Sequence, residues 1–119
     1  MDKKILIGLH DEGLANSTSI FARIRGYQPF IAPDLNELIA EAKDREYQRV
    51  IMDINFGFPF SLDVLPSFRV YEVLKPRIYL GLVRFLAISG NYETVRLAKN
   101  RGIPAEDKSD VNLSDFLKE

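Results

Sequence analysis

Cysteine is absent from the 119-residue chain, so it can form no disulfide, thiol nucleophile or zinc–thiolate site. This absence fits a reducing compartment, and we expect the protein in the cytoplasm. Long apolar runs are also missing, because the run Ile5–Leu9 is too short for a signal sequence or a membrane span. We therefore expect no membrane partner.

No excess of one charge is present either, since 16 basic and 17 acidic residues give a net charge of −1. Without a basic stripe, nucleic acid is not an expected partner. The sequence also lacks the glycine-rich G-x-G-x-x-G and Walker patterns that hold nucleotide phosphates. What remains is an ordinary globular composition, 46% hydrophobic and 28% charged, and we expect one domain over residues 1–119.

Short, nearly continuous apolar runs predict strands that are buried on both faces. The three clearest runs and two weaker ones are Ile5–Leu9, Val50–Ile54 and Val83–Ile88, then Gln28–Ala32 and Ile103–Ala105. Pro29 indicates that its strand lies toward an edge of the sheet, because proline cannot donate to a strand ladder.

Segments with apolar residues at helical spacing alternate with these runs. These segments are residues 14–24, the residues that follow Asp34, residues 66–78, Tyr92–Arg101 and a short stretch around Leu113–Leu117. Gly26 ends the first helix, and Asp34 caps the second. Pro66 suits a helix start, whereas Pro76 is expected to kink or interrupt its helix.

The alternation has the (βα)5 order, which predicts an α/β fold with a doubly wound, five-stranded parallel sheet covered on both faces. In such sheets chemistry gathers beyond the carboxyl ends of the strands. Three polar residues stand at such ends: Asp53, Ser89 and Lys108. A carboxylate, a hydroxyl and an ammonium that converge there suit phosphoryl transfer, with the carboxylate as nucleophile.

The residues Lys3–Ile7, Arg25–Tyr27, Tyr47–Asn55, Phe85–Asn91 and the Lys108 region carry a resemblance that covers essentially the whole chain. Together they resemble the receiver domains of two-component response regulators, the CheY-like family with its flavodoxin-like sheet. Compared with that family, the stretch from Asp53 to Ser89 is longer, which implies a modified third helix, and the last helix is short.

The resemblance implies a role for each polar residue at the strand ends. Asp53 matches the phosphoacceptor and a Mg²⁺ ligand, and the backbone carbonyl of Asn55 matches a second ligand. Ser89 matches the switch hydroxyl, and Lys108 matches the lysine that contacts the phosphate.

The acidic pair that binds Mg²⁺ in the family is the main departure. In an ungapped alignment this pair falls on Leu9 and His10, whereas a slip of one or two residues would offer Asp11 and Glu12. The unchanged spacing from Gly26 to Asp53 favours the ungapped register. Mg²⁺ prefers oxygen ligands, so we expect Mg²⁺ to bind weakly, with Asp11 a doubtful ligand.

Two further features keep alternative interpretations. His10 is either a loop residue hydrogen-bonded near a strand end or a pH-sensitive partner of Asp53. Phe56, Phe58 and Phe60 either plug the core or form a partner-binding patch.

Three functions follow from these patterns. The first is a stand-alone atypical receiver-like signalling domain that binds a protein partner, with Asp53 phosphorylation weak or absent. Its docking face would be formed by the fourth helix, the fifth strand and the fifth helix, and the fourth helix offers Arg96, Lys99 and Arg101 there. The second is a conventional receiver phosphorylated on Asp53 by a histidine kinase. The third is a small-molecule enzyme on a flavodoxin-like sheet. The first two involve at most self-catalysed phosphoryl transfer, and the sequence leaves the oligomeric state open.

Overall fold

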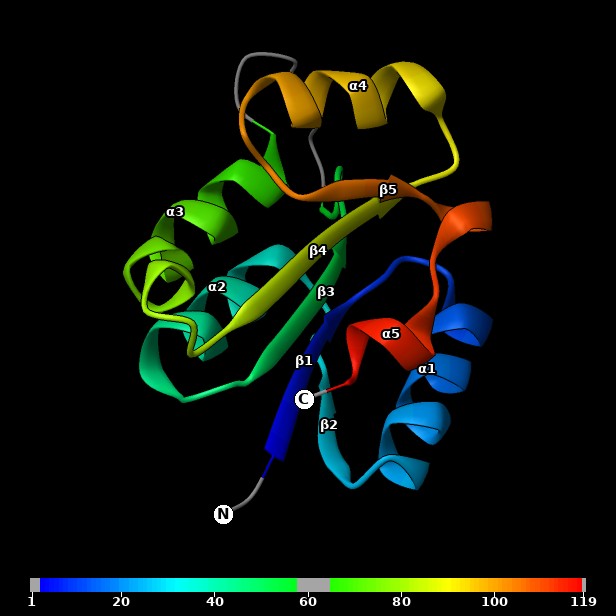
Figure 1. Ribbon diagram of the computed structural model, residues 1–119, viewed down its shortest axis with the longest axis vertical. Helices are drawn as coiled ribbons and strands as arrows, with labels where there is room; N and C mark the ends of the chain where they lie inside the picture. Colours follow the sequence, from blue (N-terminus) through cyan, green and yellow to red (C-terminus); the bar gives the residue numbers. More distant parts are fainter. Residues whose placement is uncertain (1–2, 58–64, 119) are drawn as a thin grey trace.

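A computed structural model of the chain describes residues 3–57 and 65–118, and in these residues five strands form one parallel sheet (Figure 1). The strands are β1 (Lys3–Gly8), β2 (Tyr27–Ile31), β3 (Arg49–Asp53), β4 (Arg84–Ser89) and β5 (Ala105–Asp107). Their order in the sheet is β2-β1-β3-β4-β5, so β2 and its Pro29 lie at an edge as expected. The predicted doubly wound sheet is confirmed.

Helices cover both faces of the sheet (Figure 1). They are α1 (Glu12–Ile24), α2 (Leu35–Asp44), α3 (Pro66–Tyr79), α4 (Tyr92–Asn100) and α5 (Leu113–Phe116). Buried residues of α1 and α5 pack in one core cluster, and those of α2, α3 and α4 pack in the other. Within the described residues no helix is long and apolar enough to cross a bilayer.

The central strand β3 contributes to both cores because successive side chains point to opposite faces. Ile51 packs in the core beneath α1 and α5, while Val50 and Met52 pack in the core beneath α2 and α3. All three are essentially inaccessible to solvent, and burial of each stabilises the fold by about 2 kcal/mol. Because side chains on both faces of β3 are packed, the backbone of Asp53 at its end is held in place.

Two details of the predicted elements were wrong. The fifth strand begins at Ala105 rather than Ile103, because Pro104 has no N–H to donate to a ladder. Helix α3 runs through Pro76 to Tyr79 without interruption. Pro76 is exposed in the last turn, so water can satisfy the carbonyl that loses its partner there.

The phenylalanines of the segment between β3 and α3 lie only partly within the described residues. Phe56 is buried in the core, as one of the two interpretations expected. Phe58 and Phe60 lie outside the described residues.

Gly8 ends β1 and lets α2 approach the sheet closely. A Cβ at this position would lie 2.7 Å from Leu38 Cδ2 and 3.3 Å from Met52 Cβ. The absence of a side chain therefore sets the distance between α2 and the strand that leads into the β1–α1 loop.

The short helix α5 is fastened to the opposite end of the sheet by two arginines. Arg49 Nε donates to Phe116 O at 2.8 Å, and Arg84 Nη1 donates to Asp115 O at 2.7 Å. Both arginines start neighbouring strands and face each other in the register. They satisfy carbonyls that a helix end leaves unpaired, so a four-residue helix can keep its place.

The strand register sets the arrangement of the candidate residues at the carboxyl edge. Asp53 lies opposite Ile88, so Ser89 stands one residue beyond it on β4. Ser89 in turn lies opposite Asp107, so Lys108 stands one residue further on. The three polar residues therefore form a rising diagonal across β3, β4 and β5.

Tyr47, in the segment before β3, is the basis of a test of the fold at high pH. Its hydroxyl donates to the Glu41 carboxylate. Burial, together with this hydrogen bond, raises the pKa of Tyr47 well above its ordinary value of 10.0. The folded state therefore favours the neutral hydroxyl, and its contribution to stability is complete below pH 10 and is lost as pH rises beyond that value.

We expect Tyr47→Phe to cost about 1 kcal/mol at neutral pH, because the hydrogen bond to Glu41 is lost. Above pH 10 the variant should lose less stability than the unmodified chain does. Chemical denaturation at several pH values measures both effects, with Tyr92→Phe as the exposed control. An equal alkaline loss in both chains would contradict the assignment.

Candidate functional site

A cavity of about 370 Å³ opens at the carboxyl edge of the sheet. All five residues that the sequence singles out as site residues line it. The lining comprises His10, Asp11, Asp53, Ile54, Asn55, Ile88, Ser89 and Lys108. The diagonal register of β3, β4 and β5 therefore brings the predicted carboxylate, hydroxyl and ammonium to one place.

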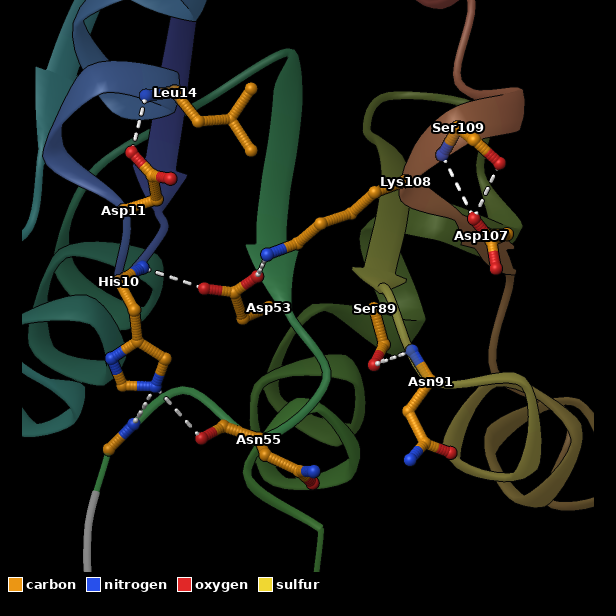
Figure 2. Close-up of polar contacts among 11 residues, drawn as sticks. His10, Asp11, Leu14, Asp53, Asn55, Ser89, Asn91, Asp107, Lys108 and Ser109 are labelled. Carbon is orange, nitrogen blue, oxygen red and sulfur yellow. Dashed lines mark hydrogen bonds and ion pairs between the residues drawn. The ribbon is translucent and has the colours of Figure 1, made fainter.

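Asp53 ends β3 and is buried, with 6% of its surface exposed. Lys108 Nζ lies 3.4 Å from Asp53 Oδ1, and the backbone N–H of His10 donates to Oδ2 at 2.6 Å (Figure 2). A buried carboxylate is costly unless cations or donors surround it. Each oxygen of Asp53 therefore has a partner supplied by a different segment of the chain.

Lys108 begins a short 3₁₀ turn whose start is fixed by Asp107. The Asp107 carboxylate accepts from the backbone N–H of Ser109 at 2.9 Å and from its hydroxyl at 2.7 Å. The backbone bond first, and the hydroxyl second, hold the pKa of Asp107 below its ordinary value of 3.8. This cap sets the direction in which Lys108 leaves β5, toward Asp53 (Figure 2).

Ser89 faces the cavity and also shapes the turn that follows β4. Its hydroxyl oxygen accepts from Asn91 N–H at 3.1 Å. Asn91 in turn caps α4 by accepting from Thr94 N–H at 3.1 Å. The hydroxyl proton of Ser89 is left to donate to a group in the cavity.

The positions expected to supply acidic metal ligands have structural roles instead. Leu9 is buried in the core with α1 and α5. Asp11 is the N-cap of α1, and its Oδ1 accepts from Leu14 N–H at 3.0 Å. That bond satisfies one of the four N–H groups that a helix start leaves without an internal partner.

The His10 side chain lies over the segment that follows β3. Its Nε2 is 3.1 Å from the Asn55 carbonyl oxygen and 3.3 Å from Gly57 N, and its ring packs on Phe56. With a proton on Nε2 the ring donates to the Asn55 carbonyl, and without one it accepts from Gly57. Either way, the imidazole stands against the carbonyl that the resemblance assigns to Mg²⁺.

Magnesium requires near-octahedral oxygen coordination and usually takes one or two carboxylates. Here both oxygens of Asp53 are engaged, the Asn55 carbonyl lies against His10, and Asp11 caps a helix. Among the described residues no group of three or more histidine or acidic side chains is placed to hold a metal. The two carboxylates that line the cavity, those of Asp53 and Asp11, therefore already have partners within the chain.

The backbone of His10 is the functional group that sequence reasoning missed. The sequence interpretations concerned the imidazole, whereas the amide N–H makes the contact with Asp53. A side-chain pattern carries no information on where a loop amide points. The nearest signal is the replacement of an acid by Leu9, which binds the end of β1 into the core and draws the next amide toward β3.

No protein-family model and no curated protein sequence matches the chain. Solved structures do. A CheY-like response regulator receiver domain protein from Methanospirillum hungatei is 23% identical, with a TM-score of 0.71 over 98% of this chain and 89% of that one.

Two further neighbours are described with bound ions. A receiver domain of a sensor histidine kinase from Pseudomonas aeruginosa, with magnesium in its active site cleft, is 14% identical. Its TM-score is 0.72 over 97% of this chain and 91% of that one. A Burkholderia pseudomallei response regulator, with a phosphorylated aspartic acid, calcium and citrate, is 19% identical. Its TM-score is 0.69 over 98% of this chain and 65% of that one.

The chain has the fold of a CheY-like receiver domain. The predicted five-stranded arrangement and its flavodoxin-like order are confirmed by these neighbours. The receiver fold puts Asp53 at the end of the central strand, and this chain surrounds it with Lys108 and the His10 amide.

The role of Asp11 can be tested by its effect on stability. We expect Asp11→Ala to lower the free energy of unfolding by about 1 kcal/mol, because α1 loses its cap. Asp11→Ser should retain most of that stability, since a serine hydroxyl also accepts from the helix start. Urea denaturation measures both.

A different result would indicate that Asp11 is a metal ligand. Stability would then be unchanged in Asp11→Ala without Mg²⁺, while a Mg²⁺-dependent chemical shift at Asp53 would disappear.

Proposed function

We propose that this chain is an atypical receiver-like signalling domain of two-component type, which works by binding a protein partner and in which phosphorylation of Asp53 is weak or absent. The observation that carries the proposal is the double engagement of Asp53 by Lys108 and the His10 amide. Each contact uses one lone pair of an oxygen that would attack a phosphoryl group or bind the metal. Asp53 then acts as a structural anion that holds three segments together.

The metal argument points the same way. Phosphoryl transfer concentrates negative charge that a cation must offset, and Mg²⁺ usually supplies that cation in such sites. Leu9 lies in the core, and the only other carboxylate among the described residues that line the cavity, that of Asp11, is held at the start of α1 through its Oδ1. We therefore propose that Mg²⁺ binds weakly and that the domain performs no metabolic reaction.

The docking surface that we propose lies on α4. Tyr92, Arg96 and Lys99 are exposed and follow one another at helical spacing, so they share one face. A cationic face with an aromatic residue suits an acidic patch on a signalling protein. Ser89 and Asn91 connect this helix to the cavity through the turn that they hydrogen-bond.

A conventional phosphoacceptor, phosphorylated by a histidine kinase, is the second candidate. It is favoured by the presence of Asp53, Ser89 and Lys108 in one cavity. In that function the Ser89 hydroxyl and the Lys108 ammonium would hold the phosphoryl oxygens.

Treatment with acetyl phosphate, or with beryllofluoride, in millimolar Mg²⁺ separates the two candidates. We expect no gain of a phosphoryl mass and no amide shifts around the cavity, because Asp53 is already neutralised by the chain. Intact mass spectrometry and NMR measure these outcomes, with Asp53→Asn as the control. A mass gain of one phosphoryl group that disappears in Asp53→Asn would establish the conventional receiver instead.

The metal site can be tested by restoring one acid. We expect His10→Asp to raise the affinity for Mg²⁺ at least about tenfold, or about 1.4 kcal/mol, because it adds a carboxylate and frees the Asn55 carbonyl. Leu9 is left unchanged, since an acid in its buried position would unfold the domain. Titration of Mg²⁺ followed by NMR measures the affinity.

His10→Asn is the matched control, because it frees the carbonyl without adding a charge. If His10→Asp and His10→Asn bound Mg²⁺ equally well, position 10 would not belong to the acidic pair, and Asp11 would be the better candidate.

A further inference from the structure

The turn between α3 and β4 lies at the end of the sheet opposite the carboxyl ends of the strands (Figure 1). It presents large apolar side chains to solvent. Tyr79, Leu80 and Leu82 are 71%, 74% and 59% exposed. Scattered exposed apolar residues are ordinary, but three within four positions form a patch that indicates a contact. We call Tyr79–Leu82 the basal turn.

The backbone of the basal turn is fixed. Gly81 N–H donates to Ile78 O at 3.0 Å and Leu82 N–H donates to Arg77 O at 2.9 Å, with Gly81 at a φ of 76°. This is the Schellman arrangement that ends a helix, in which the residue at the position of Leu82 commonly packs back on the helix. Here Leu82 remains exposed, so a rigid turn holds the apolar side chains outward.

Cations surround the basal turn. Gly81 and Val83 line a cavity of about 610 Å³ whose other walls are Arg49, Arg84, Lys118 and Asp115. On the other side, Lys75 Nζ lies 5.7 Å from the centre of the Tyr79 ring.

Nearby carboxylates only partly offset these charges. Asp115 lies 3.8 Å from Lys118, and Glu72 lies 3.9 Å from Lys75. Among the residues that the structure describes here, four cations thus face two acids, in a chain whose net charge is −1. Arg84 uses Nη1 on α5, and within the described part of the chain no hydrogen bond from its Nε or Nη2 is found. The cavity therefore retains donors for an anion.

We propose that the basal turn is a peripheral membrane contact, in which Leu80 and Leu82 enter the interface and the cationic cavity binds anionic phospholipid headgroups. A tyrosine and two leucines that project from a turn, with lysine and arginine behind them, match the two attractions that hold a protein to an anionic bilayer. Exposed fractions above one half mean that the side chains protrude rather than line a groove. A protruding apolar turn suits a lipid surface better than it suits a protein helix.

The proposal is independent of the function proposed for the Asp53 cavity. It needs no spanning helix, so the lack of one does not bear on it. It departs from the expectation of no membrane partner, which rested only on the lack of a spanning segment and of a signal sequence in the amino-acid sequence.

The chain contains no tryptophan, so a single introduced tryptophan can report insertion. Leu80→Trp keeps an apolar side chain in the turn, and Ile24→Trp places one at an equally exposed site on α1. We expect the emission of Leu80→Trp to shift to the blue with vesicles of three parts phosphatidylcholine to one part phosphatidylserine. Ile24→Trp should not shift, and pure phosphatidylcholine should give a much weaker response.

Vesicle sedimentation of the full chain gives the affinities. We expect Leu80→Ser with Leu82→Ser to weaken binding at least about tenfold, and Lys75→Gln or Lys118→Gln to weaken it about fivefold each. Ile24→Ser and Arg23→Gln are the matched controls and should bind as the unmodified chain does. If the double serine variant fails to fold, the two lysine variants and the salt dependence of binding decide the matter.

Two results would overturn the proposal. One is the absence of binding to phosphatidylserine vesicles, or binding that neither the leucine nor the lysine variants weaken. The other is a blue shift of Leu80→Trp that follows protein concentration without vesicles, since the turn would then be an interface between two copies of the chain.

Discussion

The burial of the Asp53 carboxylate is the constraint on which the carboxyl edge of the sheet depends. An unpaired buried carboxylate costs several kcal/mol, which is a large part of the stability of a domain this size. The chain offsets this cost with Lys108 and with the His10 amide. Three segments far apart in the sequence are thereby held to one side chain, and the loops after β1, β3 and β5 take their positions from it.

The contacts that stabilise Asp53 also restrain its position. Here one oxygen is held by a backbone amide, which cannot move without moving the end of β1. Leu9 strengthens this restraint, since its burial in the core fixes the residue before that amide. A carboxylate held in this way keeps the end of β3 and the loop after β1 in a fixed arrangement.

Much of the fold could be predicted because its signals are strong and local. Continuous apolar runs identify the strands, and the residues directly after them mark the carboxyl edge where Asp53, Ser89 and Lys108 meet. The position of β5 was missed by two residues because the missing N–H of Pro104 weighs more than the apolar character of Ile103. The effect of Pro76 was overestimated because its place in the last turn, facing water, was not visible in the sequence.

The candidate site was predictable in its side chains and not in its backbone. Convergence of the polar residues follows from the parallel order of the strands. The amide of His10, the Asn91 turn and the capping role of Asp11 depend on loop conformation, which spacing alone does not fix. For the same reason the arginines that hold α5 were not distinguished in the sequence from solvent-exposed charges.

The contact between Lys108 and Asp53 also crosses the end of β4. Asp53 ends β3 and Lys108 follows β5, and β4 lies between these two strands. Strand β5 has only three residues, so its own ladder gives a weak hold on its alignment with β4. The ion pair therefore adds a second link that connects β5, at the edge of the sheet, to the central strand β3. Helix α4 packs against β5, so the ion pair also helps to fix the position of the helix that we propose as the docking surface.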